Sequence, residues 1–198
     1  HEYISKSKKP TIVSVGMASL GEIEETLKIY DQNKNNELTL LHCVSNYPCS
    51  NESLNMNVMN TLKHAFHFPV GFSDHSVGIE AAILSIALGS KVIEKHLTLD
   101  KSLPGPDHKA SSSPVEFLAY VNSIRKSEQM MGGYTKKLHE EEVGMSKVSR
   151  KSPVLNKDLV PGDILCPNDI DLIRPGGGMK PNMSKYVIGK KVRKHIKK

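Results

Sequence analysis

The sequence predicts an α/β fold followed by a small β-rich domain, and two features of the chain support this prediction. Over residues 1–131, short apolar runs alternate with longer segments of helical periodicity, which is typical of repeated strand and helix units. After residue 152 the chain changes to short strand-like pieces separated by proline and glycine turns. Four consecutive strand and helix units form either an open parallel sheet or half of an eightfold barrel.

Each of the four expected strands is followed by an expected helix. The strands lie at residues 11–17, 38–44, 68–72 and 91–93, and the helices begin at about residues 19, 55, 79 and 113. Ser19 with Glu22, and Ser113 with Glu116, have the spacing of a capping box, and Pro114 favours a helix start at the second of them. These signals indicate where two of the helices begin.

Two polar clusters, each with a histidine, follow the third and fourth strands. They are SDH at residues 73–75 and EKH at residues 94–96. Side chains alternate along a strand, so Ser73 and His75 share one face of the third strand, and Glu94 and His96 share one face of the fourth. The carboxyl ends of parallel strands form one rim, where ligands bind. We therefore expect these four groups to converge on one site.

Composition excludes several classes of protein. The chain has 198 residues, a net charge of +6 and only 5% aromatic residues, so its basic clusters favour solvated lysine-rich surface over a nucleic-acid partner. No apolar run approaches the roughly 20 residues that span a bilayer, so no membrane partner is expected. The three cysteines lack the spacing of a disulfide framework or a metal site, which favours a reducing, cytoplasmic compartment.

The segments after the fourth strand differ in character. The loop at residues 98–112 is long, and its two prolines are expected to hold Asp107 in place. Residues 132–152 are polar and charged, which suggests a linker. Residues 153–198 are expected to form the β-rich domain, with strand-like pieces SPVL, DILC, DLI and YVIG at residues 152–155, 163–166, 171–173 and 186–189.

Five blocks of the sequence, in this order and spacing, resemble the sialic acid synthase family, which makes N-acetylneuraminate and related nonulosonic acids. The blocks are LLHCVSNYP, GFSDHS, IEKHLTLD, PGPDH and IRPGGG. The resemblance implies a (β/α)8 TIM barrel joined to an antifreeze-like (SAF) domain. On that pattern, residues 1–131 supply strands 5–8 of the barrel, and residues 153–198 supply a SAF domain truncated at its end. We expect the first four strands to be missing, and the 198 residues alone to be inactive or poorly soluble.

The resemblance also implies a reaction and its catalytic groups. Family members condense phosphoenolpyruvate with an N-acyl-hexosamine, such as N-acetylmannosamine, and release phosphate. His75 and His96 resemble the two protein ligands of a divalent metal, Mn²⁺ or Mg²⁺, which would act as a Lewis acid on the aldehyde oxygen. Glu94 resembles the active-site carboxylate, which orients either a water molecule or the sugar.

Further residues resemble substrate contacts of the family. They are Ser14, Ser45, Tyr47, Ser73, Asp107 and Arg174. Some family members have Asn at the position of Ser45, which leaves the accepted sugar open. Arg174 is similar to the SAF-domain arginine that reaches into the barrel of a partner subunit, which implies a domain-swapped homodimer.

Simpler readings and other functions stand beside these. His42 is read as a packing residue, Cys43 as a small buried apolar residue, and His108 as loop surface. The chain as a whole could instead be a metal-dependent aldolase of another class, or a noncatalytic carbohydrate- or metal-binding fragment. Release of phosphate during turnover distinguishes the synthase from the aldolase.

Overall fold

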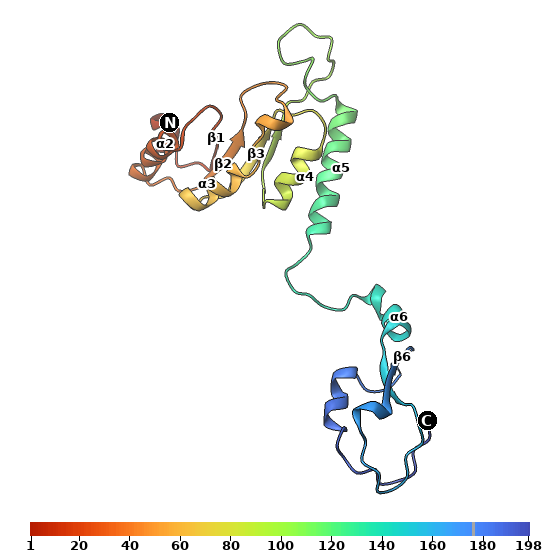
Figure 1. Cartoon of the computed structure of the whole chain (residues 1–198). Coiled ribbons are helices and arrows are strands. Elements are labelled where there is room, and N and C mark those ends of the chain that lie inside the picture. The colour runs from red at the N-terminus through yellow and green to blue at the C-terminus, as the bar shows by residue number, and fades with distance from the viewer. Residues whose placement is uncertain (176) are drawn as a thin grey trace. The chain divides into compact units, whose positions relative to one another are not determined.

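The computed structural model describes residues 1–175 and 177–198, which divide into two compact units (Figure 1). Unit 1 is His1–Gly133 and unit 2 is Tyr134–Lys198. Each unit is described by itself.

Unit 1 is built on a parallel four-stranded sheet whose strands follow the order of the chain. The strands are β1 (Thr11–Ser14), β2 (Leu38–Cys43), β3 (Val70–Asp74) and β4 (Ile93–Lys95). The helices are α1 (Glu2–Lys6), α2 (Leu20–Gln32), α3 (Val58–Phe66), α4 (Glu80–Ala87) and α5 (Pro114–Met131), with one 3₁₀ turn, η1 (Asn51–Ser53). A helix thus follows each strand, which confirms the predicted α/β class.

The two faces of the sheet have different surroundings. On the outer face, Leu40 and Phe72 are almost fully buried against the helices. The core there also includes Ile23 of α2, Met59 of α3 and Ala81 of α4. On the inner face, Ile12 is 56% exposed, although it lies in the middle of β1. The helices therefore cover one face of the sheet, and the other face is open along β1.

The boundaries of the elements agree with the sequence signals at helix starts and differ at strand ends. Both predicted capping boxes are present, at Ser19 and at Ser113. Strands β3 and β4 each begin two residues later than predicted and continue into the polar clusters. The hydrogen-bonded register includes Ser73 with Glu94 and Asp74 with Lys95, so polar residues are part of the sheet itself.

The cap of α5 makes a testable contribution to acid stability. Lys101 donates to the Glu116 carboxylate at 2.7 Å, and the Ser113 backbone N–H donates to it as well. These contacts lower the pKa of Glu116 from 4.5 to about 2. Because the folded pKa lies below the unfolded one, the stabilisation is complete above pH 4.5 and is lost as the pH falls toward 2. We expect Glu116→Gln to lose less stability than the wild type between pH 6 and pH 3, measured by urea unfolding.

The control for this prediction is Glu25→Gln, an exposed residue of α2. It is expected to keep the acid dependence of the wild type. If Glu116→Gln and the wild type lose equal stability on acidification, the Lys101 and Ser113 contacts do not stabilise the charged form of Glu116.

The described residues of unit 2 form one antiparallel strand pair and one α-helix. The elements are α6 (Glu140–Ser149), β5 (Ser152–Leu155), η2 (Pro167–Asp169), β6 (Ile170–Ile173) and η3 (Pro181–Tyr186), with β5 paired to β6. The predicted strands SPVL and DLI are confirmed. The predicted strand at residues 186–189 is wrong, because η3 runs into a turn there. Residues 163–166 form only an isolated bridge between Ile164 and Lys191. The segment predicted as a polar linker contains α6.

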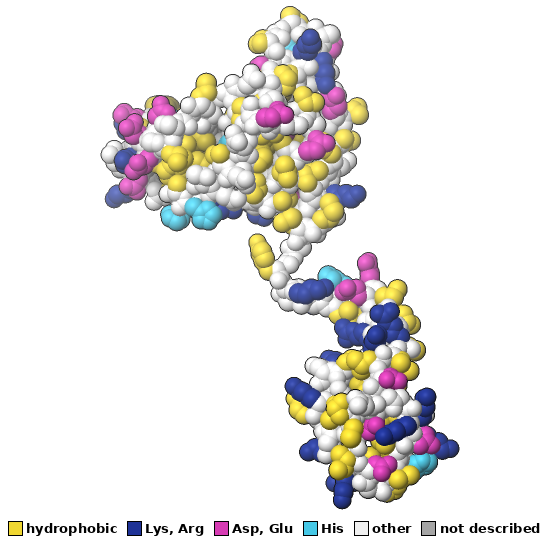
Figure 2. All heavy atoms as spheres, in the orientation of Figure 1, with side chains coloured by type: hydrophobic (Ala, Val, Ile, Leu, Met, Phe, Trp, Pro, Cys, Tyr) yellow, Lys and Arg dark blue, Asp and Glu magenta, His cyan; other side chains and the backbone are white. Residues whose placement is uncertain are grey.

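Surface charge is divided unevenly between the units. Acidic residues slightly outnumber basic ones in unit 1, so the excess positive charge of the chain lies in unit 2. Lys and Arg side chains are visible over much of unit 2 in the space-filling view (Figure 2). Among the described residues, every helix is too short or too polar to span a lipid bilayer.

Candidate active site

Polar side chains on the inner face of the sheet lie in layers at the carboxyl ends of the strands. Cys43, Ser73 and Glu94 are register partners on β2, β3 and β4 and form one layer. His75 and His96 follow Ser73 and Glu94 by two residues. Since side chains two positions apart point to the same side of a strand, both histidines belong to the next layer on this face.

The structure brings the two histidine rings together with a tyrosine ring. The ring centroids of His75 and His96 are 5.2 Å apart, with the ring planes at 90°. The ring of Tyr47, from the loop after β2, lies 4.2 Å from His96 and 5.0 Å from His75. Strand alternation predicted that the histidines meet, and the geometry agrees. The three rings therefore pack directly against one another.

The orientation of His75 is set by its neighbours. Its Nδ1 lies 2.9 Å from the carbonyl oxygen of Val44, so Nδ1 carries the proton and donates it to that carbonyl. In this tautomer, Nε2 has a free lone pair. Cys43 Sγ lies beside the ring, 3.7 Å from Nδ1 and 4.0 Å from Nε2. The ring is therefore held between a carbonyl and a thiol, with one nitrogen ready to act as a ligand.

His75 and His96 are the residues that could hold a divalent cation. If each ring nitrogen lies about 2.1 Å from an ion, each centroid lies about 3.2 Å from it. A centroid separation of 5.2 Å is short enough for both rings to reach one ion. In the described part of the chain, no group of three or more His, Cys, Asp and Glu side chains is placed to hold a metal. Two protein ligands would leave the other coordination positions to water or substrate.

The hydroxyl of Tyr47 has an unusual environment. It is buried, and within residues 1–175 and 177–198 it has no hydrogen-bond partner. Burial raises the pKa of Tyr47, the nearby Ser111 hydroxyl lowers it, and the carboxylates of Asp74 and Asp107 raise it. The hydroxyl thus stays protonated at neutral pH. A buried polar group without a partner is rare, and at a site it indicates a group that meets a ligand.

Glu94 is held in place by Ser73. The Ser73 hydroxyl donates to Glu94 Oε1 at 2.7 Å, and Ser73 itself is only 2% exposed. The Glu94 side chain is exposed on the inner face of β4. The carboxylate is therefore oriented by the sheet and accessible from the open side of the site.

The other predicted site residues differ in how they are placed relative to the rings of Tyr47, His75 and His96. Ser45 packs against Gly16, where an added Cβ would collide with the Ser45 hydroxyl oxygen. Ser14 pairs with Leu41, one layer below Cys43, and is not brought into contact with the rings. Asp107 is exposed on the loop before α5, near enough to Tyr47 to affect its pKa. Arg174 is exposed directly after β6 in unit 2.

Three residues that were given simpler roles behave differently from one another. His42 Nε2 donates to the Leu54 carbonyl at 2.7 Å, and the ring stacks on Phe72, so its packing role is confirmed. His108 is more than loop surface, because its Nδ1 lies 2.8 Å from the hydroxyl of Thr98 and this contact holds the loop at residues 98–112 in place. Cys43 is buried as predicted, but its thiol faces His75.

Sequence reasoning missed a second polar group, on the opposite face of the same strands. Asp74 and Lys95 form an ion pair at 3.1 Å, with side chains 0% and 5% exposed. The available signal was alternation itself. Asp74 stands between Ser73 and His75, and Lys95 stands between Glu94 and His96, so both point to the outer face.

A parallel sheet with helices on one face and polar groups at the carboxyl ends of its strands belongs to the α/β class, here as a curled half-barrel sheet consistent with part of a TIM barrel. Within that class the chain belongs to the NeuB family, whose model matches residues 2–136. It is 41% identical to an N,N'-diacetyllegionaminic acid synthase of Legionella pneumophila, over 96% of this chain and 55% of that protein. It is 38% identical to a pseudaminic acid synthase of Campylobacter jejuni, over 98% of this chain and 56% of that protein.

A solved structure supports the same assignment. The sialic acid synthetase of Leptospira borgpetersenii superposes with a TM-score of 0.66 and 36% identity, over 73% of this chain and 50% of that one. The chain thus spans about half the length of the relatives that it matches. These relatives are named as synthases of legionaminic, pseudaminic and sialic acids, which are all nonulosonic acids.

Proposed function

We propose that the protein carrying this chain condenses phosphoenolpyruvate with an N-acyl-hexosamine, to give a sialic acid-type nonulosonic acid and phosphate. Residues 1–131 would supply the second half of a (β/α)8 barrel, and residues 153–198 a SAF domain. The observation that carries the proposal is the contact of the His75, His96 and Tyr47 rings at the carboxyl ends of the strands. It combines two candidate ligands with one buried, unpartnered donor.

His75 and His96 would hold a divalent ion, Mn²⁺ or Mg²⁺. When bound, the ion supplies Lewis-acid polarisation of the sugar aldehyde, which favours attack by the enolpyruvate carbon. The hydrogen bond from His75 to the Val44 carbonyl supports this role, because it fixes the tautomer of His75 and leaves Nε2 unprotonated.

The other side chains would bind and orient the substrates. Tyr47 would donate its hydroxyl hydrogen to a substrate oxygen bound beside the rings. Glu94, oriented by Ser73, would accept a hydrogen bond from the water that attacks the pyruvyl carbon or from a sugar hydroxyl. Asp107 would bind sugar hydroxyls from the loop. Ser14, Ser45 and Ser73 would hold phosphate or carboxylate oxygens.

The assembly belongs to the same proposal. Arg174 would reach the N-acyl group of a substrate bound in the partner subunit, because a guanidinium donates in a fixed planar fork to a carbonyl oxygen. The working form would then be a domain-swapped homodimer. The chain as printed, with the inner face of its sheet open, would be inactive alone.

The test is a turnover assay of the protein expressed from its complete reading frame. It is incubated with phosphoenolpyruvate, Mn²⁺ and a panel of N-acyl-hexosamines, and inorganic phosphate and keto acid are measured. We expect phosphate and keto acid to appear together, in equal amounts, and only when both substrates are present. The sugar with the largest kcat/KM then identifies the product.

The same assay separates the other functions. Condensation of pyruvate with a sugar, without phosphate release, would establish the metal-dependent aldolase instead. Saturable binding of sugar or Mn²⁺ without turnover would establish the noncatalytic binding function.

A further inference from the structure

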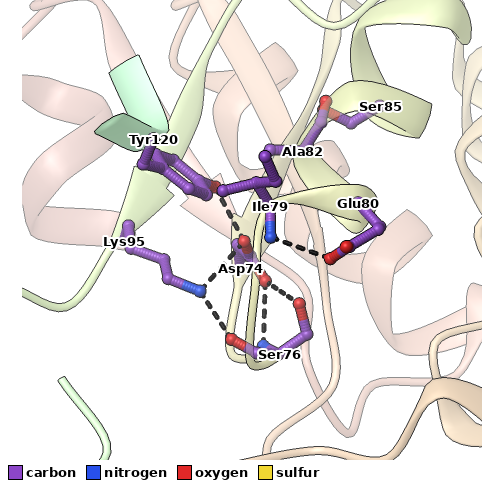
Figure 3. Close-up of polar contacts among 8 residues, drawn as sticks. All are labelled: Asp74, Ser76, Ile79, Glu80, Ala82, Ser85, Lys95 and Tyr120. Atoms are coloured by element: carbon purple, nitrogen blue, oxygen red, sulfur yellow. Dashed lines mark hydrogen bonds and ion pairs between the residues drawn. The ribbon is translucent and has the colours of Figure 1, made fainter. Parts of the chain in front are cut away.

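A closed polar network lies on the outer face of β3 and β4, behind the candidate site (Figure 3). Oδ1 of Asp74 accepts from the backbone N–H of Ser76 at 2.8 Å and from its hydroxyl at 2.6 Å. Oδ2 accepts from Lys95 Nζ at 3.1 Å and from the Tyr120 hydroxyl at 2.7 Å. Both carboxylate oxygens therefore have two donors each.

The network is largely buried, although Ser76, Lys95 and Tyr120 line one side of a surface pocket. Asp74 is 0% exposed, Tyr120 3% and Ser76 4%, and the Lys95 side chain is 5% exposed. Lys95 Nζ also lies 5.2 Å from the centroid of the Tyr120 ring, which adds a cation–π contact. Burial, and then the Asp74 carboxylate, raise the pKa of Tyr120, so its hydroxyl remains a donor at all moderate pH values. A buried pair with this many contacts has one well-defined geometry.

The network joins the two strand ends that carry the histidines. Asp74 is the residue before His75, and Lys95 is the residue before His96. Lys95 Nζ also donates to the carbonyl of Ser76, the residue after His75. The residues on both sides of His75 are thus tied to the side chain that precedes His96. Tyr120 connects both strands to α5.

The ion pair of Asp74 and Lys95 is better suited to positioning the two strand ends than to stabilising the fold. Replacing a buried ion pair by apolar residues of similar volume is often neutral or stabilising, so such a pair is weak evidence of a stabilising role. Its hydrogen bonds do restrict where the two strand ends lie relative to each other. The strand ends that carry His75 and His96 need such a restriction if the two rings are to stay at a fixed distance from each other.

We propose that Asp74, Lys95 and Tyr120 are positioning residues that set the separation and orientation of the His75 and His96 rings. The proposal rests on the proposed function in one respect, namely that the two rings share a cation. Small changes in ring placement would then weaken cation binding without removing a ligand.

The test compares two Tyr→Phe variants in the protein expressed from its complete reading frame. Tyr120→Phe removes one hydroxyl that donates to Asp74 and keeps the packed ring. Tyr30→Phe is the matched control, because Tyr30 is 1% exposed in the same unit and its hydroxyl lies 3.1 Å from His1, far along the chain from the site. Two quantities are measured, the Mn²⁺ dissociation constant by electron paramagnetic resonance and the ring resonances of His75 and His96 by NMR without metal.

We expect Tyr120→Phe to weaken Mn²⁺ binding by about 10-fold, the lower end of the range for outer contacts of metal ligands. We also expect it to shift the ring resonances of both histidines. Tyr30→Phe should do neither. Unchanged histidine resonances and unchanged Mn²⁺ affinity in folded Tyr120→Phe would overturn the proposal. Asp74→Asn, if folded, should act in the same direction and more strongly.

The two measurements separate this proposal from the proposed function. If the wild type binds no Mn²⁺, the shared-cation site is wrong, and the resonances alone decide whether the network positions the rings. Resonances that move in Tyr120→Phe and not in Tyr30→Phe support positioning in that case. Resonances that move equally in both variants overturn it, because the change is then general to unit 1.

Discussion

Replacing His75 or His96 by alanine is expected to abolish Mn²⁺ binding and turnover in the complete protein. Each substitution removes one of two imidazoles whose centroids lie 5.2 Å apart, and a single imidazole holds an ion far more weakly than a pair. Loss of an outer contact alone typically costs about 10–100-fold in affinity, so loss of a ligand should cost at least about 100-fold. The Mn²⁺ dissociation constant and the rate of phosphate release provide the two measurements.

A surface histidine supplies the control for these variants. His64 is exposed on α3, and its Nδ1 lies 2.7 Å from the carbonyl of Asn60 in the same helix. His64→Ala should keep both Mn²⁺ affinity and turnover. Circular dichroism should show that all three variants are folded. Full turnover in folded His75→Ala or His96→Ala would remove that residue from the proposed metal site.

The inner face of the sheet could be predicted because one short-range rule governs it. Alternation along a strand places Ser73 with His75 and Glu94 with His96, whatever the rest of the fold does. The hydrogen bond between Ser73 and Glu94 and the meeting of the two histidine rings follow from that rule and from parallel pairing. The capping boxes at Ser19 and Ser113 were equally predictable, because a cap depends only on residues three apart.

The polar network of Asp74, Lys95 and Tyr120 was not predicted, because a charged residue in a strand is ordinarily expected to face solvent. Neither Asp74 nor Lys95 was assigned a role from the sequence. Their burial depends on Tyr120, which reaches Asp74 from a helix 46 positions along the chain. No local pattern marks that contact. Tyr120 in turn had the appearance of an apolar position on an amphipathic helix.

Unit 2 was predicted less well because its elements are short and lack apolar periodicity. Helix α6 begins with Glu140, Glu141 and Glu142 and has Lys147 in its last turn, so its charges complement the helix dipole. None of its residues is buried, and the absence of an apolar stripe made it look like a linker. The apolar residues 186–189 resembled a strand, but the turn after η3 includes Gly189 at a φ of +81°.

Lys95→Met is expected to lower the stability of unit 1 by about 3–5 kcal/mol, the usual cost of removing one partner of a buried ion pair. The substitution keeps the apolar part of the side chain and removes the charge, so Asp74 remains fully buried without its cation. Since small domains have a total stability of only about 5–15 kcal/mol, this loss is a large fraction of the whole. Urea unfolding measures it.

Lys28→Met is the matched control for that loss, because it makes the same chemical change at an exposed pair. Lys28 and Glu24 lie 3.1 Å apart on α2, with side chains 61% and 59% exposed. Exposed pairs at this spacing contribute roughly 0.3–0.5 kcal/mol, since water screens them. The two variants should therefore differ by several kcal/mol. A broken buried pair costs about 3–5 kcal/mol. A difference between the two variants below about 1 kcal/mol would therefore mean that Lys95 does not stabilise the buried charge of Asp74.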